Sequence, residues 1–336
     1  MFNILNKMNK EAILNETSSK KLVNDELGSY NYDKARNIFI EGDNLEALRL
    51  IRQVYDKKIK LIYLDPPYNT GNEFIYDDSK KGGGYCEYKL SRNSFYKNIG
   101  ERHQKWIQMM YPRLLISREL LREDGVIVVS IDDNEMFELR FLLNEIMGEE
   151  NFLGVLVWRR KNYDYEKVTG IETQHEYIVL YKKGSAYKDK YLKPISSWIE
   201  YGIDNYIIDK KNHYELKCCY QDKCKKDIDD LFEKDMKINY PKSVMQMKLL
   251  IDLFCQKDDF VLDLFAGSGT LGQAIIEYNK EKNFDIAFVL IQMAKPTTKG
   301  NFNKISDIAF ERCILTYQKM KYDENKCWGI RRMLIE

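Results

Sequence analysis

The chain has 336 residues, of which 44% are hydrophobic, which is enough for one sizeable α/β core with an inserted or appended module and excludes a single small domain. Its 53 basic and 52 acidic residues leave a formal charge of only +1, so any nucleic-acid binding must use a local basic face. Seven cysteines without paired spacing, no charged-then-apolar leader and no apolar run of membrane-spanning length predict a cytoplasmic protein with no membrane partner.

The first half of the chain alternates between strand and helix patterns. Residues 37–40 predict a short strand and residues 44–55 a helix with one apolar face. Residues 59–64 predict the next strand, and a helical pattern follows over about 102–122. Residues 126–131 predict a fully buried strand. The side chains expected in the core of these two helices are Leu45, Leu48, Ile51, either Val54 or Tyr55, Trp106, Met109, Met110, Leu114 and Ile116.

The pattern then changes. Asp132 or Asp133 is expected to cap a helix that runs through Glu145. Strands near 153–158 and 176–182 are expected to complete the sheet as an antiparallel addition. Because strands and helices alternate over most of the chain, the fold class is α/β with a parallel sheet.

A carboxylate, two prolines and an aromatic ring follow the strand 59–64, as Asp65-Pro66-Pro67-Tyr68. The prolines remove two backbone donors and keep the preceding residues extended, so we expect the Pro66 carbonyl to project beside the Asp65 carboxylate. Two neighbouring acceptors suit an exocyclic amino group, and the Tyr68 ring offers a stacking face for a planar base. The motif therefore predicts an aromatic amine as substrate; the alternative is a plain turn after a buried strand.

A glycine-rich turn follows the strand pattern Phe260-Val261-Leu262, and it reads Asp263-Leu264-Phe265-Ala266-Gly267-Ser268-Gly269-Thr270. Gly267 and Gly269 allow close backbone approach, and a helix opening near Thr270 presents unpaired N–H groups to a polar or anionic cofactor. The glycines alone are compatible with a dinucleotide, a phosphate or no ligand, and the third glycine of the dinucleotide fingerprint is missing. Since both motifs end predicted strands, we expect them to face each other across one cleft.

In this order the two motifs resemble those of the beta-class DNA amino-methyltransferases, which use S-adenosylmethionine. Further ordered matches extend the resemblance over most of the chain and are similar to the modification subunit of type III restriction-modification systems. These matches are Ile40 to Leu45, Leu64 to Gly71, Asp124 to Glu135, His175 to Tyr177, Pro241 to Ser243, the glycine turn, and Ile305 to Ala309. The resemblance implies a Rossmann-like S-adenosylmethionine-dependent methyltransferase sheet with a small inserted target-recognition region.

The resemblance also implies roles for individual residues. The catalytic set is Asp65, Pro66, Pro67 and Tyr68. The cofactor-binding set is Asp43 and Asn44 near the adenine end, Lys242 and Ser243 near the carboxylate, Asp263 near the methionine portion, and Asp65, Phe265, Gly267, Ser268, Gly269, Thr270 and Gln292. Gln292 stands after the strand 286–291, where many such folds place an acid that binds the ribose hydroxyls.

Adenine N6 is the expected target atom, because the resemblance associates an initial aspartate with N6-adenine enzymes and serine more often with N4-cytosine enzymes. In double-stranded DNA the base must be extruded to reach this site, and Tyr68 would stack on it. Asp65 is expected to work as an ionised acceptor that holds the amine. The alternatives are cytosine N4 methylation and a DNA-binding partner subunit without catalysis; an RNA target is more distant, and a protein glutamine is disfavoured because that motif typically begins with asparagine.

The expected domain organisation consists of two catalytic-core halves and two further segments. They are an N-terminal extension (1–36), a catalytic half (37–183), a target-recognition region (184–240) and a cofactor-binding half (241–336). The recognition region is shorter than in type III modification subunits. A solitary methyltransferase and one that needs a restriction or specificity subunit are both compatible with it, as is a homodimer.

Three further features are less specific. His213, Cys218, Cys219 and Cys224 are of metal-ligand type but lack ligand spacing, so no metal is expected. His103 and His175 are isolated, and His175 is expected to be structural. The segment 76–100, with three glycines beside two lysines, is either a mobile loop that closes over nucleic acid or a solvated connector.

Overall fold

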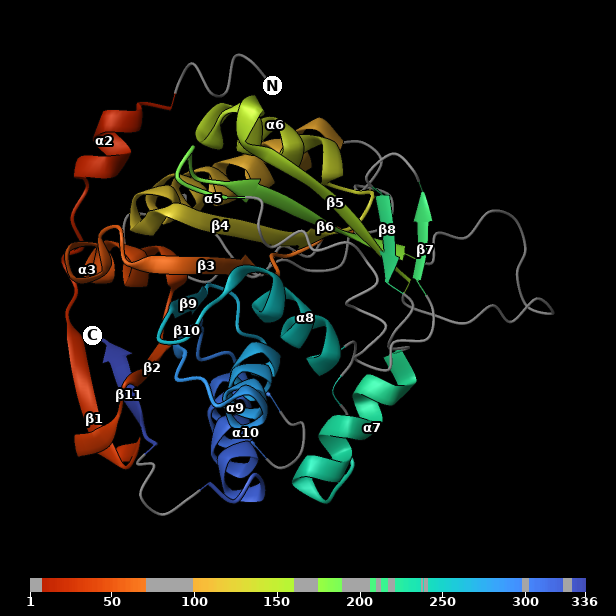
Figure 1. Cartoon of the computed structure of the whole chain (residues 1–336). Coiled ribbons are helices and arrows are strands. Elements are labelled where there is room, and N and C mark those ends of the chain that lie inside the picture. Colours follow the sequence, from red (N-terminus) through yellow and green to blue (C-terminus); the bar gives the residue numbers. More distant parts are fainter. Residues whose placement is uncertain are drawn as a thin grey trace.

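One mixed sheet organises the computed structural model. The structure describes residues 8–70, 99–159, 175–188, 206–209, 213–216, 221–236, 238, 241–297, 302–322 and 328–336. Within these residues, eleven strands pair in the order β1-β11-β2-β10-β9-β3-β4-β6-β5-β8-β7 (Figure 1). The glycine and lysine segment of the expected loop 76–100 lies outside the described residues, as do Cys218 and Cys219.

The bounds of the elements follow the sequence pattern closely in the core. The strands are β1 (Leu22–Tyr30), β2 (Asn37–Glu41), β3 (Ile59–Leu64), β4 (Leu121–Ile131), β5 (Phe152–Arg159), β6 (His175–Lys182), β7 (Tyr206–Asp209), β8 (His213–Leu216), β9 (Phe260–Asp263), β10 (Ala287–Gln292) and β11 (Ile330–Ile335). The α-helices are α2 (Lys10–Asn15), α3 (Asn44–Tyr55), α5 (Ile99–Leu120), α6 (Met136–Met147), α7 (Gln221–Phe232), α8 (Val244–Phe254), α9 (Thr270–Lys282) and α10 (Ile305–Lys319). Short 3-10 turns are η1 (Tyr32–Lys34) and η2 (Glu149–Asn151).

The middle of the sheet is parallel, as the alternation of strands and helices predicts. Strands β11, β2, β10, β9, β3 and β4 run parallel to their neighbours in this set. Strand β6 pairs antiparallel with β4, and β5 pairs antiparallel with β6. The antiparallel addition expected from residues 153–158 and 176–182 is therefore confirmed.

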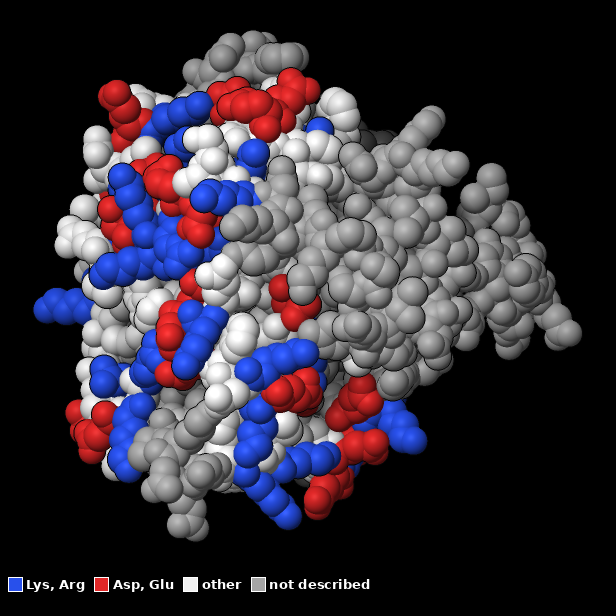
Figure 2. Space-filling view, in the orientation of Figure 1, with Lys and Arg blue, Asp and Glu red and all other residues white. Residues whose placement is uncertain are grey.

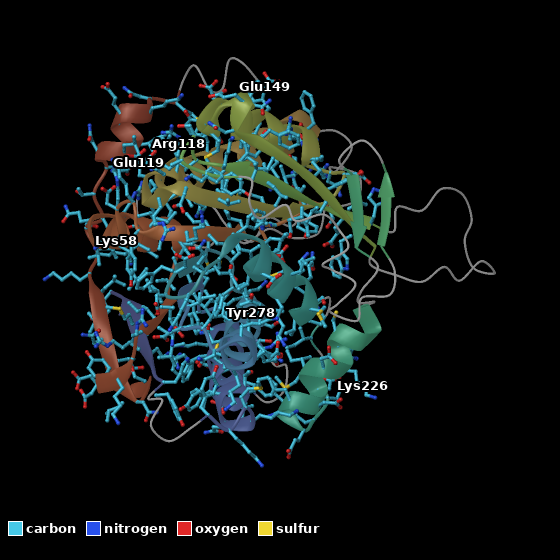
Figure 3. The ribbon with its side chains drawn as sticks, viewed as in Figure 1. Lys58, Arg118, Glu119, Glu149, Lys226 and Tyr278 are labelled. Atoms are coloured by element: carbon cyan, nitrogen blue, oxygen red, sulfur yellow. The ribbon has the colours of Figure 1, made fainter. Side chains whose placement is uncertain are left out.

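Helices cover both faces of this sheet, because successive strand side chains point to opposite sides. On β3, Ile62 and Leu64 belong to the core cluster that includes residues of α3, α5 and α6. Leu61 and Tyr63 belong to the cluster on the opposite face, with α8, α9 and α10. Tyr278 of α9, labelled in Figure 3, lies in this second layer, where its hydroxyl donates to Asp252 of α8 at 2.6 Å.

The expected helix cores are confirmed. Leu45, Leu48 and Ile51 of α3 are buried, and of the two alternatives at its end Tyr55 is buried while Val54 is 59% exposed. The apolar side chains predicted to be core on α5 are all buried, namely Trp106, Met109, Met110, Leu114 and Ile116.

The predicted cap of the helix after β4 is wrong. The N-cap of α6 is Glu135, whose side chain makes no capping bond. Asp132 instead accepts from the backbone N–H of Asn134 at 2.9 Å, and Asp133 accepts from the Tyr177 hydroxyl at 2.7 Å. Both carboxylates are thus used inside the loop and across to β6, so the helix begins a few residues later.

The edges of the sheet contain elements that the sequence pattern did not indicate. Strand β1 lies in the expected N-terminal extension and pairs antiparallel with β11 near the other end of the chain. Strand β11 in turn pairs in parallel with β2. The weakly periodic stretch 184–240 contributes β7, β8 and α7.

The described surface is mixed in charge. In the part of the face that Figure 2 shows in colour, Lys and Arg lie interspersed with Asp and Glu, apart from a group of acidic side chains at the top of the view. A local basic face for nucleic acid is not visible in that part. Among the described residues, none of the helices combines the length and apolar character needed to cross a membrane.

Candidate active site

Strands β3 and β9 are parallel neighbours, and this pairing brings the two sequence motifs together. Tyr63 on β3 is aligned with Asp263 on β9, and the Leu264 N–H donates to the Tyr63 carbonyl at 3.3 Å. Because both strands end at the same edge of the sheet, Asp65 and the glycine turn leave it side by side.

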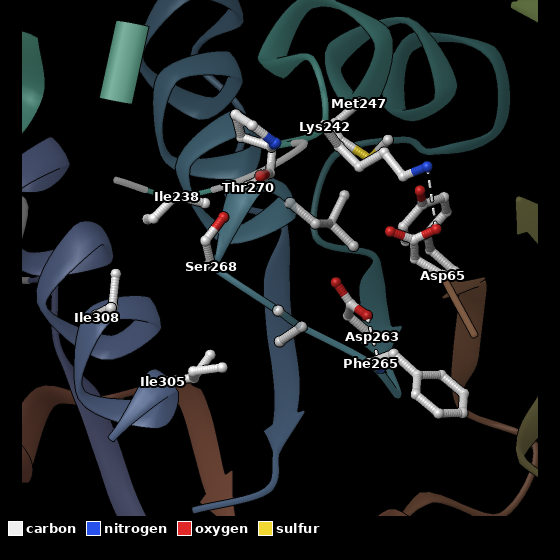
Figure 4. Close-up of a pocket in the computed structure, with 15 residues that line it drawn as sticks. Asp65, Ile238, Lys242, Met247, Asp263, Phe265, Ser268, Thr270, Ile305 and Ile308 are labelled. Carbon is white, nitrogen blue, oxygen red and sulfur yellow. Dashed lines mark hydrogen bonds and ion pairs between the residues drawn. The ribbon is translucent and has the colours of Figure 1, made fainter. Parts of the chain in front are cut away.

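A cavity of about 200 Å³ opens at this edge (Figure 4). It is lined by Tyr63, Asp65, Ile238, Pro241, Lys242, Met247, Asp263, Phe265, Ala266, Gly267, Ser268, Thr270, Leu271, Ile305 and Ile308. The lining therefore joins the carboxylate of the first motif to the turn of the second, as expected from the strand ends.

Four polar side chains converge beside the cavity. The ammonium Nζ of Lys242 lies 3.1 Å from Asp65 Oδ1 and 2.6 Å from Glu176 Oε2. It also lies 2.5 Å from the Tyr68 hydroxyl oxygen. That hydroxyl is 2.9 Å from Asp65 Oδ1 and 3.1 Å from Glu176 Oε2, so it donates its one proton to a carboxylate and accepts from the lysine.

Burial and charge set the protonation of this group. Burial raises the pKa of Asp65, and the nearby Lys242 ammonium opposes that rise. Although burial alone would lower it, the pKa of Lys242 is raised by Asp65 and Glu176. Burial and the same carboxylates hold the pKa of Tyr68 well above its usual range, so its hydroxyl remains a neutral donor.

Two aromatic rings flank the lysine ammonium. The Lys242 Nζ atom lies 4.8 Å from the centre of the Tyr68 ring and 5.5 Å from the centre of the Trp158 ring. Trp158 of β5 is aligned with Glu176 of β6 and is buried, and its indole N–H has no hydrogen-bond partner among the residues that the structure describes. The acceptors of Asp65 and Glu176 thus face a space bounded by aromatic surfaces.

The loop that follows β3 is held from the side of α5 and α6. The Trp106 indole N–H donates to the Pro67 carbonyl at 2.7 Å. Asn69 has a left-handed φ of 55° and donates to the buried Glu135, which His103 Nδ1 also contacts at 2.8 Å. These bonds fix the path of the chain through the prolines.

The same two helices contain the one group of metal-ligating type found among the described residues. Ligand atoms of His103, Glu135 and Glu138 lie within 4.8 Å of one another. Glu135 already accepts from Asn69 and His103, so these residues act as a brace for the loop after β3. The sequence pattern did not assign His103 or Glu135 to the site. The indication available for Glu135 was its place at the end of the family match from Asp124 to Glu135.

The glycine turn adopts backbone conformations that other residues rarely adopt. Gly267 has φ +55° and Gly269 has φ +81°. A Cβ at position 269 would lie 2.7 Å from the Ala309 carbonyl oxygen, so α10 packs directly against this turn. Gly269 caps α9 without a side-chain bond, which leaves the helix N-terminus open to a ligand.

Asp263 lies at the floor of the turn. Its carboxylate accepts from the Phe265 N–H at 3.0 Å, yet the side chain is only 2% exposed. Burial raises the pKa of Asp263 to about 8. A nearby cation therefore has a large effect on the charge of this group.

The fully buried Arg312 of α10 holds the turn from behind. Its guanidinium donates to the Ser268 hydroxyl at 3.0 Å, to the Thr270 hydroxyl at 2.8 Å and to the Gln273 amide oxygen at 2.6 Å. Sequence reasoning missed this residue. The indication available in the sequence was a basic residue on an otherwise apolar helix face, just after the family match from Ile305 to Ala309.

Five of the expected cofactor residues stand outside the lining of the cavity, and one of them is Gly269, the N-cap of α9. Asp43 caps α3, and Asn44 donates to the Leu264 carbonyl at 2.8 Å. Ser243 caps α8. The Gln292 amide oxygen accepts from the Gly267 N–H at 2.7 Å. In this structure each of them shapes the turn or a helix end next to the cavity.

Comparison with known proteins identifies the family. The family model described as DNA methylase matches residues 59–324, which include both motifs. This chain belongs to the DNA methylase family. The methylase is 26% identical to the Mod subunit of the type III restriction-modification enzyme EcoP15I from Escherichia coli, over 85% of this chain and 64% of that protein.

Two further similarities show how much of a relative's length the chain covers and which solved fold it resembles. The methylase is 25% identical to the type II methyltransferase M.KpnI from Klebsiella pneumoniae, over 92% of this chain and 94% of that protein. Its fold is similar to that of the cytosine-N4-specific PvuII DNA methyltransferase, with a TM-score of 0.51, 14% identity and coverage of 85% and 93% of the two chains. It spans less than two thirds of the type III subunits that it matches, 64% of EcoP15I Mod and 58% of StyLTI Mod.

Proposed function

We propose that this methylase transfers a methyl group from S-adenosylmethionine to N6 of an adenine that has been flipped out of double-stranded DNA. The observation that carries the proposal is the single cavity that joins Asp65 to the glycine turn. An amine acceptor and a cofactor cradle must share one space for direct transfer, because the reacting atoms have to lie in line.

The residues around the turn fit this methyl donor. Gly267 lines the cavity, and a Cβ added there would lie 3.7 Å from the Phe265 carbonyl oxygen, so the backbone leaves room for a ligand, and the open N-terminus of α9 offers N–H donors. Lys242 gives the lining a cation for the cofactor carboxylate, and Asp263 gives it a carboxyl group for the cationic methionine portion. When bound, S-adenosylmethionine supplies an electrophilic methyl group on a sulfonium.

The chain's own residues then act on the amine. An exocyclic nitrogen is a poor nucleophile because its lone pair is delocalised into the ring. Asp65 accepts one N–H, and the Pro66 carbonyl is proposed to accept the other, which localises the lone pair and stabilises the positive charge that develops on nitrogen. Tyr68 provides the stacking face and, through its hydroxyl bond at 2.9 Å, orients the Asp65 carboxylate.

Target identity and partners are part of the same proposal. The aspartate that begins the motif favours adenine N6 over cytosine N4. Residues 184–240 are proposed to read the DNA sequence, either alone or with a specificity or restriction subunit or a second copy of the chain. Restriction-modification or epigenetic marking is the proposed setting, in line with the names of the relatives.

Expression of this chain alone in a host that lacks DNA methylation, followed by long-read sequencing, tests the proposal. The expected result is modified adenine in one fixed sequence context, and no such mark with Asp65→Ala. Modified cytosine would support the N4 alternative. Absence of any mark, together with no S-adenosylmethionine binding by calorimetry, would support a non-catalytic partner subunit.

A further inference from the structure

Lys242 is the residue expected to bind the cofactor carboxylate, yet its ammonium lies beside two acidic side chains of the protein. It is the one cation among the described residues that line the cavity, so it is the side chain available there to pair with a cofactor carboxylate. Its ammonium nevertheless lies 3.1 Å from Asp65 and 2.6 Å from Glu176, away from the glycine turn (Figure 4). One flexible side chain cannot satisfy both partners at full strength.

The place that the ammonium occupies has the features expected for a target amine. It provides two carboxylate acceptors, Asp65 and Glu176, and its aromatic boundaries are Tyr68 and Trp158, at 4.8 and 5.5 Å from Nζ. The Lys242 ammonium, itself an N–H donor, already occupies this place. A base amine therefore has to compete with a fully charged donor for the same acceptors, and a charged donor forms the stronger bond.

The charges of the cofactor change the competition between Lys242 and the base amine for Asp65 and Glu176. S-adenosylmethionine carries a carboxylate, an ammonium and a permanent sulfonium. A lysine ammonium held at Asp65 repels the sulfonium, whereas the cofactor carboxylate attracts the lysine. Asp65 and Glu176 keep a positive neighbour in either arrangement, first the lysine and then the sulfonium.

We propose that Lys242 is a switch that couples cofactor binding to base entry. Without cofactor, its ammonium occupies the amine position between Asp65 and Glu176. With cofactor bound, it turns to the cofactor carboxylate and leaves Asp65 free for the base. The four-carbon stem of lysine allows such a change without movement of α8. This inference rests on the proposed function and adds an order of binding, cofactor before base.

Calorimetry with S-adenosylhomocysteine tests the first half of the switch, because this ligand keeps the carboxylate but has no sulfonium. Lys242→Met is expected to weaken binding roughly tenfold by removing the carboxylate partner. Glu176→Gln is expected to tighten binding about threefold by weakening the resting contact. Effects of the same sign in the two variants, or no effect of Glu176→Gln, would overturn the switch.

Lys248→Met is the matched control. Lys248 lies on α8, the helix that begins just after Lys242, and pairs with Glu277 and Glu281 at 2.6 and 2.7 Å, and it is not part of the cavity lining. Its replacement is expected to leave the dissociation constant of S-adenosylhomocysteine unchanged. Thermal unfolding of all three variants shows whether each is folded; if Lys242→Met is not, Glu176→Gln alone decides the question.

Base entry is read with 2-aminopurine placed beside the methylated adenine, which keeps its N6 amine, once sequencing has identified the site. In the unaltered protein, the fluorescence rise on flipping should be at least severalfold larger with S-adenosylhomocysteine than without it. In Lys242→Met the rise should be independent of the ligand. Equal flipping with and without ligand in the unaltered protein would overturn the switch while leaving methylation intact, whereas absence of any methylated site would reject the proposed function itself.

Discussion

Tyr63 and Asp263 are aligned neighbours on the parallel strands β3 and β9. The chain continues from Tyr63 to Asp65 within two residues and from Asp263 directly into the glycine turn. Two motifs far apart in the sequence therefore open into one cavity, and the register of a single strand pair sets their separation.

Replacement of Asp65 should remove catalysis but not the cofactor site. Asp65→Ala is expected to lower the methyl-transfer rate by more than about 100-fold, because the amine loses its charged acceptor. Binding of S-adenosylhomocysteine should remain as strong or become stronger, since Lys242 loses a resting partner. Single-turnover assays and calorimetry measure the two effects; appreciable turnover in the variant would contradict the assigned role.

The glycine turn should not tolerate a side chain at its second glycine. Gly269→Ala places a Cβ 2.7 Å from the Ala309 carbonyl at a φ of +81°, so a loss of about 2 kcal/mol in unfolding free energy is expected. Cofactor affinity should fall more than tenfold, as the turn has to shift. Urea unfolding measures the loss in unfolding free energy, and calorimetry measures the fall in cofactor affinity.

Gly100→Ala is the control for that change. Gly100 lies in the first turn of α5, and a Cβ there would meet no atom within 4 Å. The substitution should be neutral or stabilise by a few tenths of a kcal/mol through helix propensity.

Gly267→Val tests the first glycine, where φ is +55°, and normal cofactor affinity in that variant would reject the assigned loop.

Asp263 should make stability depend on pH. Its pKa is about 8 in the folded protein against an ordinary value of 3.8, so between these values the folded state holds one proton more than the unfolded state. Stability from this group is complete below about pH 4 and falls as pH rises toward 8, by up to about 1.4 kcal/mol per pH unit.

Asp263→Asn should remove this slope. Unfolding in urea from pH 5 to pH 8.5 should show the unaltered protein losing stability relative to the variant up to about pH 8 and no further above it. A difference between the two proteins that stays constant over this range would show that the carboxyl group does not titrate there.

Arg312 should act as a positioning residue for the cofactor turn. Arg312→Met keeps apolar volume but removes donors to Ser268, Thr270 and Gln273, so a loss of about 2 kcal/mol in unfolding free energy is expected. The KM for the cofactor should rise about tenfold with little change in kcat, because no contact with the base is lost.

Two variants make this test specific. Arg312→Lys keeps the charge but not the forked geometry, so partial rescue of KM is expected. Arg118→Met removes a half-exposed arginine from α5, whose nearest carboxylate is 3.8 Å away, and should change neither quantity. An Arg312→Met enzyme with unaltered KM would show that the guanidinium supports only the packing of α10.

Local patterns in the sequence were sufficient for the elements that carry the site. The apolar run before Asp65, the run before the glycine turn and the amphipathic helix 44–55 each predict their own structure, because burial and helix or strand periodicity are properties of neighbouring residues. The parallel direction of the central strands also follows from the alternation of strands and helices, whereas the pairing of β3 with β9 is a finding of the structure.

Contacts between distant segments lay beyond these patterns. The pairing of β1 with β11, the cap of α6, the support of the turn by Arg312 and the bond between Lys242 and Glu176 all depend on which side chains the folded sheet brings within a few ångströms. Which chemical groups stand at the strand ends can thus be predicted from neighbouring residues. The place of the Lys242 ammonium between Asp65 and Glu176 came from the folded structure alone, because its direction is fixed by charges contributed from β6 and from the loop after β3.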